Sequence, residues 1–351
     1  MTTMSWTWPA SHAANLADDE VKRHLFEQGA VVVRGAVPRE VCAAALRRVN
    51  ARLERALVES GQASTAVDPG GTAASADADI DAAARYFGNV ASPPHRRDLK
   101  LSLTPEIITC LTELLTVLRP TLSEVLTEDA ELCELSALVS DPGAAAQNLH
   151  PDTQITGATA HCALLTAFLA LQDVSPDMGP TEVVPRSHTA AAHAALSAGN
   201  KQGGGGGGGT GGGEAALLAG GWLPPQPALL SAGDVLVMDS RAIHRGSANN
   251  SHSHTPREGV QVRAVLPGGE EDVEEEEGGG EGGGGGGGRR VLLYVSFQVP
   301  NNAPPGSTYS LLEEYQGRFR LRNHERWRDP AAEVEAEEEQ RAASSEQRVE
   351  Q

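Results

Sequence analysis

Paired cysteines are missing from this chain. Its four cysteines are scattered, and no two of them are separated by only two residues, as in the CxxC pattern of zinc ribbons and redox sites. The sequence therefore does not predict a fold held together by structural zinc or by a disulfide framework. We expect free and mostly buried thiols at Cys42, Cys110, Cys133 and Cys162.

Long apolar segments are missing as well. A helix that crosses a bilayer needs roughly 20 consecutive apolar residues, and no uninterrupted apolar run approaches that length. Residues 1–19 also lack the basic region followed by an apolar region that a secretory signal would show. We expect a cytoplasmic protein that does not bind membranes.

Basic residues are in the minority, since 28 Lys and Arg stand against 47 Asp and Glu and give a formal net charge of −19. Most of the excess lies in residues 270–281 and 329–351, which hold eight acidic residues each. The rest of the chain shows neither the basic surface of a nucleic-acid-binding protein nor a clear basic cluster for the phosphates of coenzyme A. We therefore expect a small-molecule substrate and no nucleic-acid partner, and the sequence indicates no protein partner.

What the chain does contain is a helical first third followed by short β-type runs from about residue 135. Pro120 is expected to kink or break the last of the early helices. Helices first and strands afterwards indicate an α+β fold, in which helices support an antiparallel sandwich or barrel. The expected helices cover 18–29, 38–57 and 104–126, and the expected strands cover 30–33, 165–174, 181–184, 234–238 and 291–299.

The composition indicates one domain with additions. We expect this domain at 18–322, after a flexible N-terminus at 1–17 and before an acidic tail at 329–351. Two glycine-rich tracts interrupt it, at about 199–214 and 268–288, and the second is also acidic. Such tracts cannot bury enough apolar surface to order themselves, so we expect disordered insertions.

The segment QNLHPDT, residues 147–153, carries the most informative pattern. Residues two apart on a strand share a face, so His150 and Asp152 can present an imidazole and a carboxylate to one metal ion. Pro151 favours a strand end or edge, and His244 follows another strand-like run. Two imidazoles and one carboxylate suit Fe(II) with positions left for a bidentate cosubstrate and O2, although zinc accepts the same ligands.

A pair of arginines, Arg289 and Arg290, opens the apolar run VLLYVSF at 291–297. A guanidinium that points into a barrel can bind the far carboxylate of 2-oxoglutarate bidentately. Because side chains alternate along a strand, only one of two adjacent arginines can point inward.

These segments together resemble the phytanoyl-CoA dioxygenase family of Fe(II)- and 2-oxoglutarate-dependent oxygenases. The resemblance covers roughly residues 20–320 and implies a double-stranded β-helix of the jelly-roll or cupin kind with supporting N-terminal helices. It also implies iron bound by His150, Asp152 and His244, with 2-oxoglutarate and O2 as cosubstrates. The implied reaction is hydroxylation of a small organic substrate while 2-oxoglutarate is converted to succinate and CO2. The motifs that carry the resemblance are LFEQGAVVVRGAVPREVCAAALRRV, QNLHPDT, LTAFLALQDVSPDMGPTEVVPRSHT, SAGDVLVMDSRAIHRGSANNS and RRVLLYVSFQ.

The resemblance also assigns roles around the metal. Within the family the anchoring arginine precedes a phenylalanine by seven residues, which favours Arg290 over Arg289 because of Phe297; Arg263 is a competitor. Related halogenases lack the carboxylate ligand, so the presence of Asp152 favours hydroxylation.

Gln147 and Thr153, next to the ligand pair, are candidates either for lining the cosubstrate or substrate pocket or for structural hydrogen bonds alone. His188 belongs to a structural loop in the family pattern and is not expected to bind the metal.

The chain departs from the family at Arg186, where a glycine usually precedes Ser-His, and in the long insertion before the anchor strand. Two other functions stay open. One is a non-catalytic cupin-type protein that binds a metal or ligand. The other is a zinc hydrolase, which would need a general base, and the nearby carboxylates such as Asp173 fall in a strand end or turn.

Overall fold

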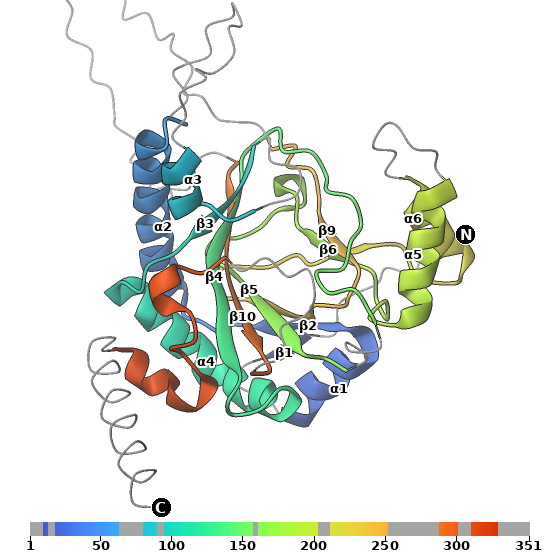
Figure 1. Ribbon diagram of the computed structural model, residues 1–351, viewed down its shortest axis with the longest axis horizontal. Coiled ribbons are helices and arrows are strands. Elements are labelled where there is room, and N and C mark those ends of the chain that lie inside the picture. Colours follow the sequence, from blue (N-terminus) through green and yellow to red (C-terminus); the bar gives the residue numbers. More distant parts are fainter. Residues whose placement is uncertain are drawn as a thin grey trace, which may run out of the picture.

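Two sheets face each other at the centre of the molecule (Figure 1), and all their strand pairs are antiparallel except the edge pair formed by residues 10–12. The computed structural model describes residues 10–12, 18–62, 80–89, 95–156, 161–202, 211–251, 288–300 and 310–328. The larger sheet contains, in spatial order, β1 (Ala10–His12), β2 (Ala30–Arg34), β8 (Val235–Asp239), β5 (Leu164–Ala170), β10 (Arg290–Gln298), β4 (Glu131–Ser140) and β3 (Arg96–Lys100). The smaller sheet contains β7 (Gln226–Pro227), β6 (Thr181–Val183) and β9 (His244–Gly246). Strands that pair are distant in sequence, and this arrangement is the expected double-stranded β-helix within an α+β fold.

Alternation along each strand of the larger sheet divides its residues between two cores. In β2, Val31 and Val33 face the helices, whereas Ala30 and Val32 face the smaller sheet. β10 follows the same rule, so that Val291, Leu293 and Val295 join the helical core and Leu292 and Tyr294 join the core between the sheets. The second core lies between the two sheets, where a jelly roll places its ligand site.

The helices expected in the first third cover the outer face of the larger sheet. They are α1 (Asp18–Gln28), α2 (Arg39–Glu59) and α4 (Pro105–Val125), and they lie to the left of and below the sheet in Figure 1. Each turns an apolar stripe inward, as Leu53 of α2 and Leu114 of α4 show, because both are fully buried. Pro120 lies inside α4 without ending it. A short helix, α3 (Ile80–Tyr86), and strand β3 were not predicted.

The glycine-rich segment near residue 200 contains more helix than its composition predicts. α5 (Ala190–Gln202) and α6 (Gly211–Ala219) pack on each other at the side opposite to α2 (Figure 1). Residues 199–202 and 211–214, which were expected to be disordered, therefore belong to helices. The reason is the apolar contact of Leu196 and Leu217 with Ile243 beside the smaller sheet. Residues 203–210, 268–287 and 329–351 lie outside the described residues, and of the N-terminal 1–17 only β1 is described, parallel to β2.

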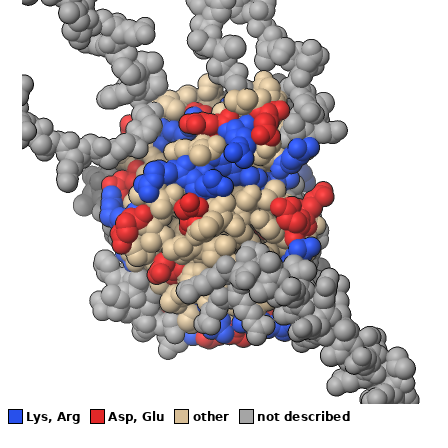
Figure 2. Space-filling model, turned by 90° about the vertical axis from the view of Figure 1, so that its left-hand side faces the viewer, with Lys and Arg blue, Asp and Glu red and all other residues tan. Residues whose placement is uncertain are grey.

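One face of the molecule carries a band of basic side chains, shown in Figure 2. On this side α2 exposes Arg47, Arg48 and Arg55, and a hollow beside α2 is lined by Arg48, Arg52 and Arg55. Such a cluster was not expected from the sequence, although positions 48, 52 and 55 share one face of a helix. Within the described part of the chain, no helix has the length and apolar character needed to cross a membrane.

Arg186 adopts the left-handed backbone conformation, with φ of 63°. A glycine would adopt this conformation without strain, which gives a physical reason for the glycine usual in the family. The side chain of Arg186 is exposed, while its N–H donates to the carbonyl of Gln28 at 2.8 Å. The adjacent Ser187 is buried and accepts the N–H of Ile243 at 2.7 Å. The loop thus keeps its shape, and the departure costs backbone strain only.

We expect Arg186→Gly to raise the free energy of unfolding by about 1 kcal/mol or less, because relief of the left-handed strain outweighs the greater flexibility of glycine in the unfolded chain. Urea unfolding followed by circular dichroism would measure the change. Arg186→Ala is the matched control, since alanine removes the same side chain but keeps the strain. Equal stabilities of the two variants would contradict the explanation.

Candidate metal centre

The segment that holds His150 runs antiparallel to β9 at the edge of the smaller sheet. The N–H of His150 donates to the carbonyl of His244 at 3.0 Å, and the reverse bond measures 2.9 Å. Directly opposite residues of an antiparallel pair place their side chains on the same face. The two imidazole rings therefore lie together, with centroids 4.6 Å apart. The N–H of Gln147 donates to the carbonyl of Gly246 at 2.9 Å and extends the pairing.

Asp152 completes the group because it lies two residues beyond His150. Its Oδ1 is 3.8 Å from Nε2 of His150 and 3.6 Å from Nε2 of His244. Pro151 leaves the pairing intact, since a residue next to a hydrogen-bonded position turns its nitrogen away from the partner strand. One ligand atom from each of the three residues lies within 4.8 Å of the others, so the three could hold one metal ion.

Both histidines are oriented as metal ligands. Nδ1 of His150 lies 2.8 Å from the carbonyl of Asn148, and Nδ1 of His244 lies 3.0 Å from that of Ala242. Each Nδ1–H is thereby engaged by a backbone carbonyl. The lone pair of each Nε2 points toward Asp152 and toward the other imidazole ring. Burial, together with the charge of His244, lowers the pKa of His150 and favours the neutral imidazole that a metal binds.

Of the two arginines that open β10, only Arg290 points between the sheets. It is 1% exposed, and its Nη1 donates to the carbonyl of Gly179. Arg289 turns the other way and forms an ion pair with Asp141. Arg263, the competing candidate, lies outside the described residues.

A second inward arginine, Arg96 on β3, was missed in the sequence. Ser140 on β4 lies opposite both Arg96 and Arg290, so the two arginines share the inner face, one on each side of β4. Arg96 is 3% exposed, and its Nη2 donates to the carbonyls of Ala145 at 2.9 Å and Ser247 at 3.1 Å. The signal that could have revealed it is the doublet of arginines at 96 and 97, which repeats the doublet at 289 and 290.

The outer member of each doublet has a carboxylate partner, and the inner member has none among the described residues. Arg97 pairs with Asp141 at 2.7 Å, and Arg289 pairs with the same carboxylate. By contrast, Nε of Arg96 and Nε of Arg290 are buried and have no hydrogen-bond partner within the described part. Asp141 therefore neutralises the outward pair of arginines, whereas no described carboxylate neutralises the inward pair.

Burial of these cations is unfavourable without an anion. Burial, and to a lesser extent the charge of Arg96, lowers the pKa of Arg290 to about 9, and burial also lowers the pKa of Arg96. A buried charge is normally paired, and a carboxylate matches the planar fork of a guanidinium. The pair therefore fits the distal carboxylate of a dicarboxylic cosubstrate.

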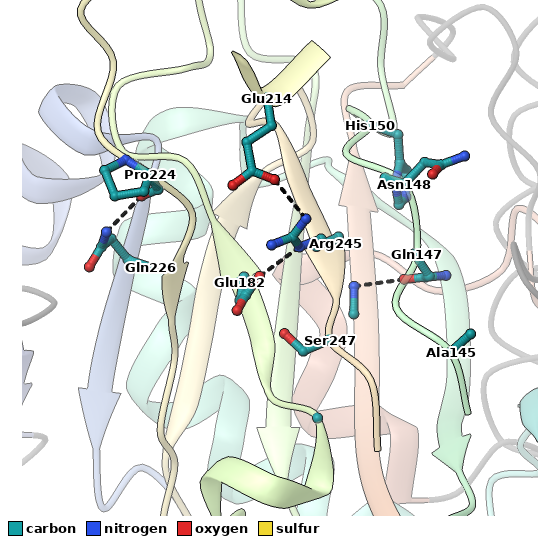
Figure 3. Close-up of polar contacts among 12 residues, drawn as sticks. Ala145, Gln147, Asn148, His150, Glu182, Glu214, Pro224, Gln226, Arg245 and Ser247 are labelled. Carbon is teal, nitrogen blue, oxygen red and sulfur yellow. Dashed lines mark hydrogen bonds and ion pairs between the residues drawn. The ribbon is translucent and has the colours of Figure 1, made fainter. Parts of the chain in front are cut away.

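Gly246 makes room for this pair. A Cβ atom at residue 246 would lie 2.5 Å from Nη1 of Arg96 and 2.9 Å from Oε1 of Gln147. Oε1 of Gln147 accepts the N–H of Gly246 at 2.8 Å (Figure 3), so this side chain makes a structural hydrogen bond. Thr153 is 2% exposed, and its hydroxyl has no partner among the described residues. Thr153 thus keeps a free polar group beside the ligand pair.

Arg245, between His244 and Gly246, turns to the opposite face of β9. It forms ion pairs with Glu182 at 2.6 Å and with Glu214 at 3.0 Å (Figure 3). These bonds join β9 to β6 and to α6. Arg245 thereby fixes the strand that carries His244, one of the three candidate metal ligands.

A family model described as phytanoyl-CoA dioxygenase matches residues 25–259. The chain belongs to the phytanoyl-CoA dioxygenase family. Fe(II), 2-oxoglutarate and O2 are the cofactor and cosubstrates of this family, and the group of His150, Asp152 and His244 has the donor set that suits such iron. A search of curated proteins gives no match.

Several solved structures are similar to this chain at low identity. AviO1 from Streptomyces viridochromogenes Tue57 is 16% identical with a TM-score of 0.48, over 84% of this chain and 99% of that one. SnoK, a non-heme alpha ketoglutarate dependent carbocyclase from nogalamycin biosynthesis, is 16% identical with a TM-score of 0.44, over 84% and 87%. HygX from Streptomyces hygroscopicus, solved with nickel and 2-oxoglutarate, is 15% identical with a TM-score of 0.43, over 80% and 87%. Similarity at this level does not indicate a substrate.

We expect Asp152→Ala to weaken the binding of Co(II) or Fe(II) by about 100-fold or more, since even the loss of an outer-shell partner costs 10–100-fold in metal affinity. Isothermal titration under anaerobic conditions would measure it. Asp177→Ala, which removes an exposed carboxylate of the 3-10 turn Pro176–Met178, should bind metal like the wild type. Unchanged affinity in the Asp152 variant would rule out this group as the metal site.

Proposed function

We propose that the protein is an Fe(II)- and 2-oxoglutarate-dependent dioxygenase that hydroxylates a small organic substrate. In this proposal His150, Asp152 and His244 bind the iron, and Arg290 anchors the distal carboxylate of 2-oxoglutarate. Arg96 is added as a second contact to that carboxylate. Thr153 contributes a hydroxyl to the cosubstrate or substrate pocket.

The observation that carries the proposal is the placement of two unpaired buried arginines on the same inner region as the three metal donors. A metal-binding protein without catalysis needs the donors but not the arginines. Because no described carboxylate neutralises the two guanidinium groups, the site favours a ligand that carries a carboxylate. Iron together with a dicarboxylate is the requirement of a 2-oxoglutarate oxygenase.

The residues of the chain have distinct tasks in this reaction. The backbone pairing of His150 with His244 sets the separation of the two imidazoles, and their Nδ1–H bonds fix the tautomer. Arg290 and Arg96 orient the cosubstrate by charge and fork geometry. When bound, iron and 2-oxoglutarate supply the activation of O2 and the oxidative decarboxylation to succinate and CO2.

Asp152 supports hydroxylation in particular. A carboxylate in the ligand set occupies the place that halogenases of this type leave for a halide. The side chain of Asp152 is 41% exposed, whereas that of His244 is 8% exposed. Asp152 thus lies on the side from which a substrate approaches the metal group.

A zinc hydrolase is less well supported. Asp173, the candidate general base, forms two bonds of 2.9 Å with the guanidinium of Arg39 and accepts the N–H of Ala232 at 2.8 Å. These bonds lower the pKa of Asp173, and they engage the carboxylate at the outer surface. Asp173 is therefore unsuited to abstract a proton at the metal.

The decisive experiment mixes the anaerobic protein with Fe(II) and 2-oxoglutarate, and then admits O2. We expect a weak visible metal-to-ligand charge-transfer band, followed by succinate even without substrate. The band requires bidentate binding of the cosubstrate to iron, so absence of the band despite bound metal would favour the non-catalytic protein. Zinc in place of iron is the control and should give no succinate.

We expect Arg290→Ala to raise the KM for 2-oxoglutarate by about 10–100-fold, because bonds to a charged group contribute roughly 1.5–3 kcal/mol. Arg96→Gln should raise it by about tenfold, and metal affinity should change little in both. Arg289→Ala and Arg97→Gln are matched controls, since each removes the outward arginine of the same doublet. An effect of the controls equal to that of the inward variants would show that the arginines act through general charge.

A further inference from the structure

Along β10, the side chains on the inner face of the larger sheet change from basic to neutral. Arg290, Leu292, Tyr294 and Ser296 alternate on this face, and the register with β4 stays regular up to Ser296. Arg290 begins the row and Ser296 ends it, about 20 Å away at 3.3 Å per residue. The end near Arg290 is cationic, and the end near Ser296 is not.

Three polar side chains form a hydrogen-bonded row at the Ser296 end. Ser296 lies opposite Glu134 on β4 and opposite Thr166 on β5. Its hydroxyl donates to Oε2 of Glu134 at 2.5 Å and lies 2.9 Å from the hydroxyl of Thr166. Ser296 is 0% and Thr166 2% exposed, whereas Glu134 is half-buried. Glu134 is therefore the most accessible member of the row.

A second carboxyl group lies nearby, but its bonds are complete. Asp98 on β3 is 2% exposed and accepts the hydroxyl of Tyr294 at 3.0 and 3.1 Å and that of Ser310. Glu134 accepts the hydroxyl of Ser296 and the backbone N–H of Ser310, and among the described residues no Lys or Arg forms an ion pair with it. Asp98 has a structural role, while Glu134 retains capacity for a further bond.

Glu134 lies within electrostatic reach of the metal group. Burial, followed by the charges of Asp152 and Asp98, raises the pKa of Glu134 to about 8. A carboxyl group held in this way is costly to ionise, and a donor group brought to it would relieve the cost. Glu134 and the arginine pair thus lie at opposite ends of the inner face. The group of His150, Asp152 and His244 adjoins this face.

We infer that the row Glu134–Ser296–Thr166 is the polar wall of the substrate pocket and that the substrate brings a hydrogen-bond donor, a hydroxyl or an ammonium group, to Glu134. The inference rests on the proposed function and names its substrate class. A purely aliphatic chain at this position would shield Glu134 from water without giving it a further hydrogen bond, which disfavours such a substrate. A pocket selects its substrate in this way because the wrong substrate leaves a buried polar group of the pocket without a hydrogen bond.

The test uses the full chain loaded anaerobically with Fe(II) and 2-oxoglutarate, and three probes with the same five-carbon skeleton. Pentylammonium, 1,5-pentanediol and pentanoate are titrated while the charge-transfer band is followed. We expect the amine or the diol to perturb the band at lower concentration than pentanoate. A stronger effect of the amine identifies an ammonium substrate, and a stronger effect of the diol identifies a hydroxylated one.

Two substitutions make the result specific to Glu134. Glu134→Leu should weaken the binding of amine and diol by about tenfold or more, whereas Glu134→Gln should weaken the amine more than the diol. Glu131→Gln on the same strand is the control, since Glu131 pairs with Arg320 at 2.7 Å, and it should bind the probes like the wild type. The unperturbed band of each variant verifies that iron and 2-oxoglutarate still bind.

The inference is overturned if pentanoate is the preferred probe, if neither amine nor diol acts, or if Glu134→Leu binds them as the wild type does. A missing band in the wild type is a separate result, because it contradicts the proposed function and not the pocket. In that case thermal-shift titration of the same probes with the wild type and the Glu134 variants decides the role of Glu134 without the metal.

Discussion

The backbone pairing between His150 and His244 is the interaction on which the site depends. Two hydrogen bonds of 3.0 and 2.9 Å hold these residues opposite each other, across segments almost one hundred positions apart in sequence. All three donors follow from this one contact, because Asp152 shares the face of His150 by strand alternation. Shifting the pairing by one residue would turn the ligands away from one another. The surroundings support the register through Gln147 on one strand and Arg245 on the other.

A second constraint is the separation of charge across the inner face of the larger sheet. Asp141 neutralises the outward arginines of two strands, and the inward arginines have no carboxylate partner among the described residues. Glu134 lies at the other end of the face, and Asp98 lies between the two ends, two residues from Arg96 on β3. Burial raises the pKa of both carboxyl groups. The interior therefore offers a cationic end for a dicarboxylate and an acidic end for a donor group. In the proposed function, this polarity orients the cosubstrate and the substrate toward His150, Asp152 and His244.

The supporting parts of the fold tolerate considerable change in sequence. Arg186 occupies a left-handed position where the family usually has glycine, yet Ser187 and the backbone around it keep their bonds. The helices α5 and α6, which flank a glycine-rich tract, still supply leucines to a small core against Ile243. In such places the sequence can drift because packing and backbone hydrogen bonds, and not one required side chain, determine the structure.

The sequence by itself determined the types of the main elements and indicated His150, Asp152 and His244 as candidate metal donors. Helical stripes predicted α1, α2 and α4, and apolar runs between turn residues predicted β2, β5, β6, β8 and β10. The spacing of His150 and Asp152 needed only strand geometry. The sequence did not predict β7 or β9. It left open which arginine points inward, because alternation gives two equivalent registers, and it did not reveal Arg96 or Glu134. Their roles depend on β3 and β5 lying beside β4 and β10, a proximity created by long-range pairing. Only the tertiary structure decided these points, since no local pattern records which distant strands become neighbours.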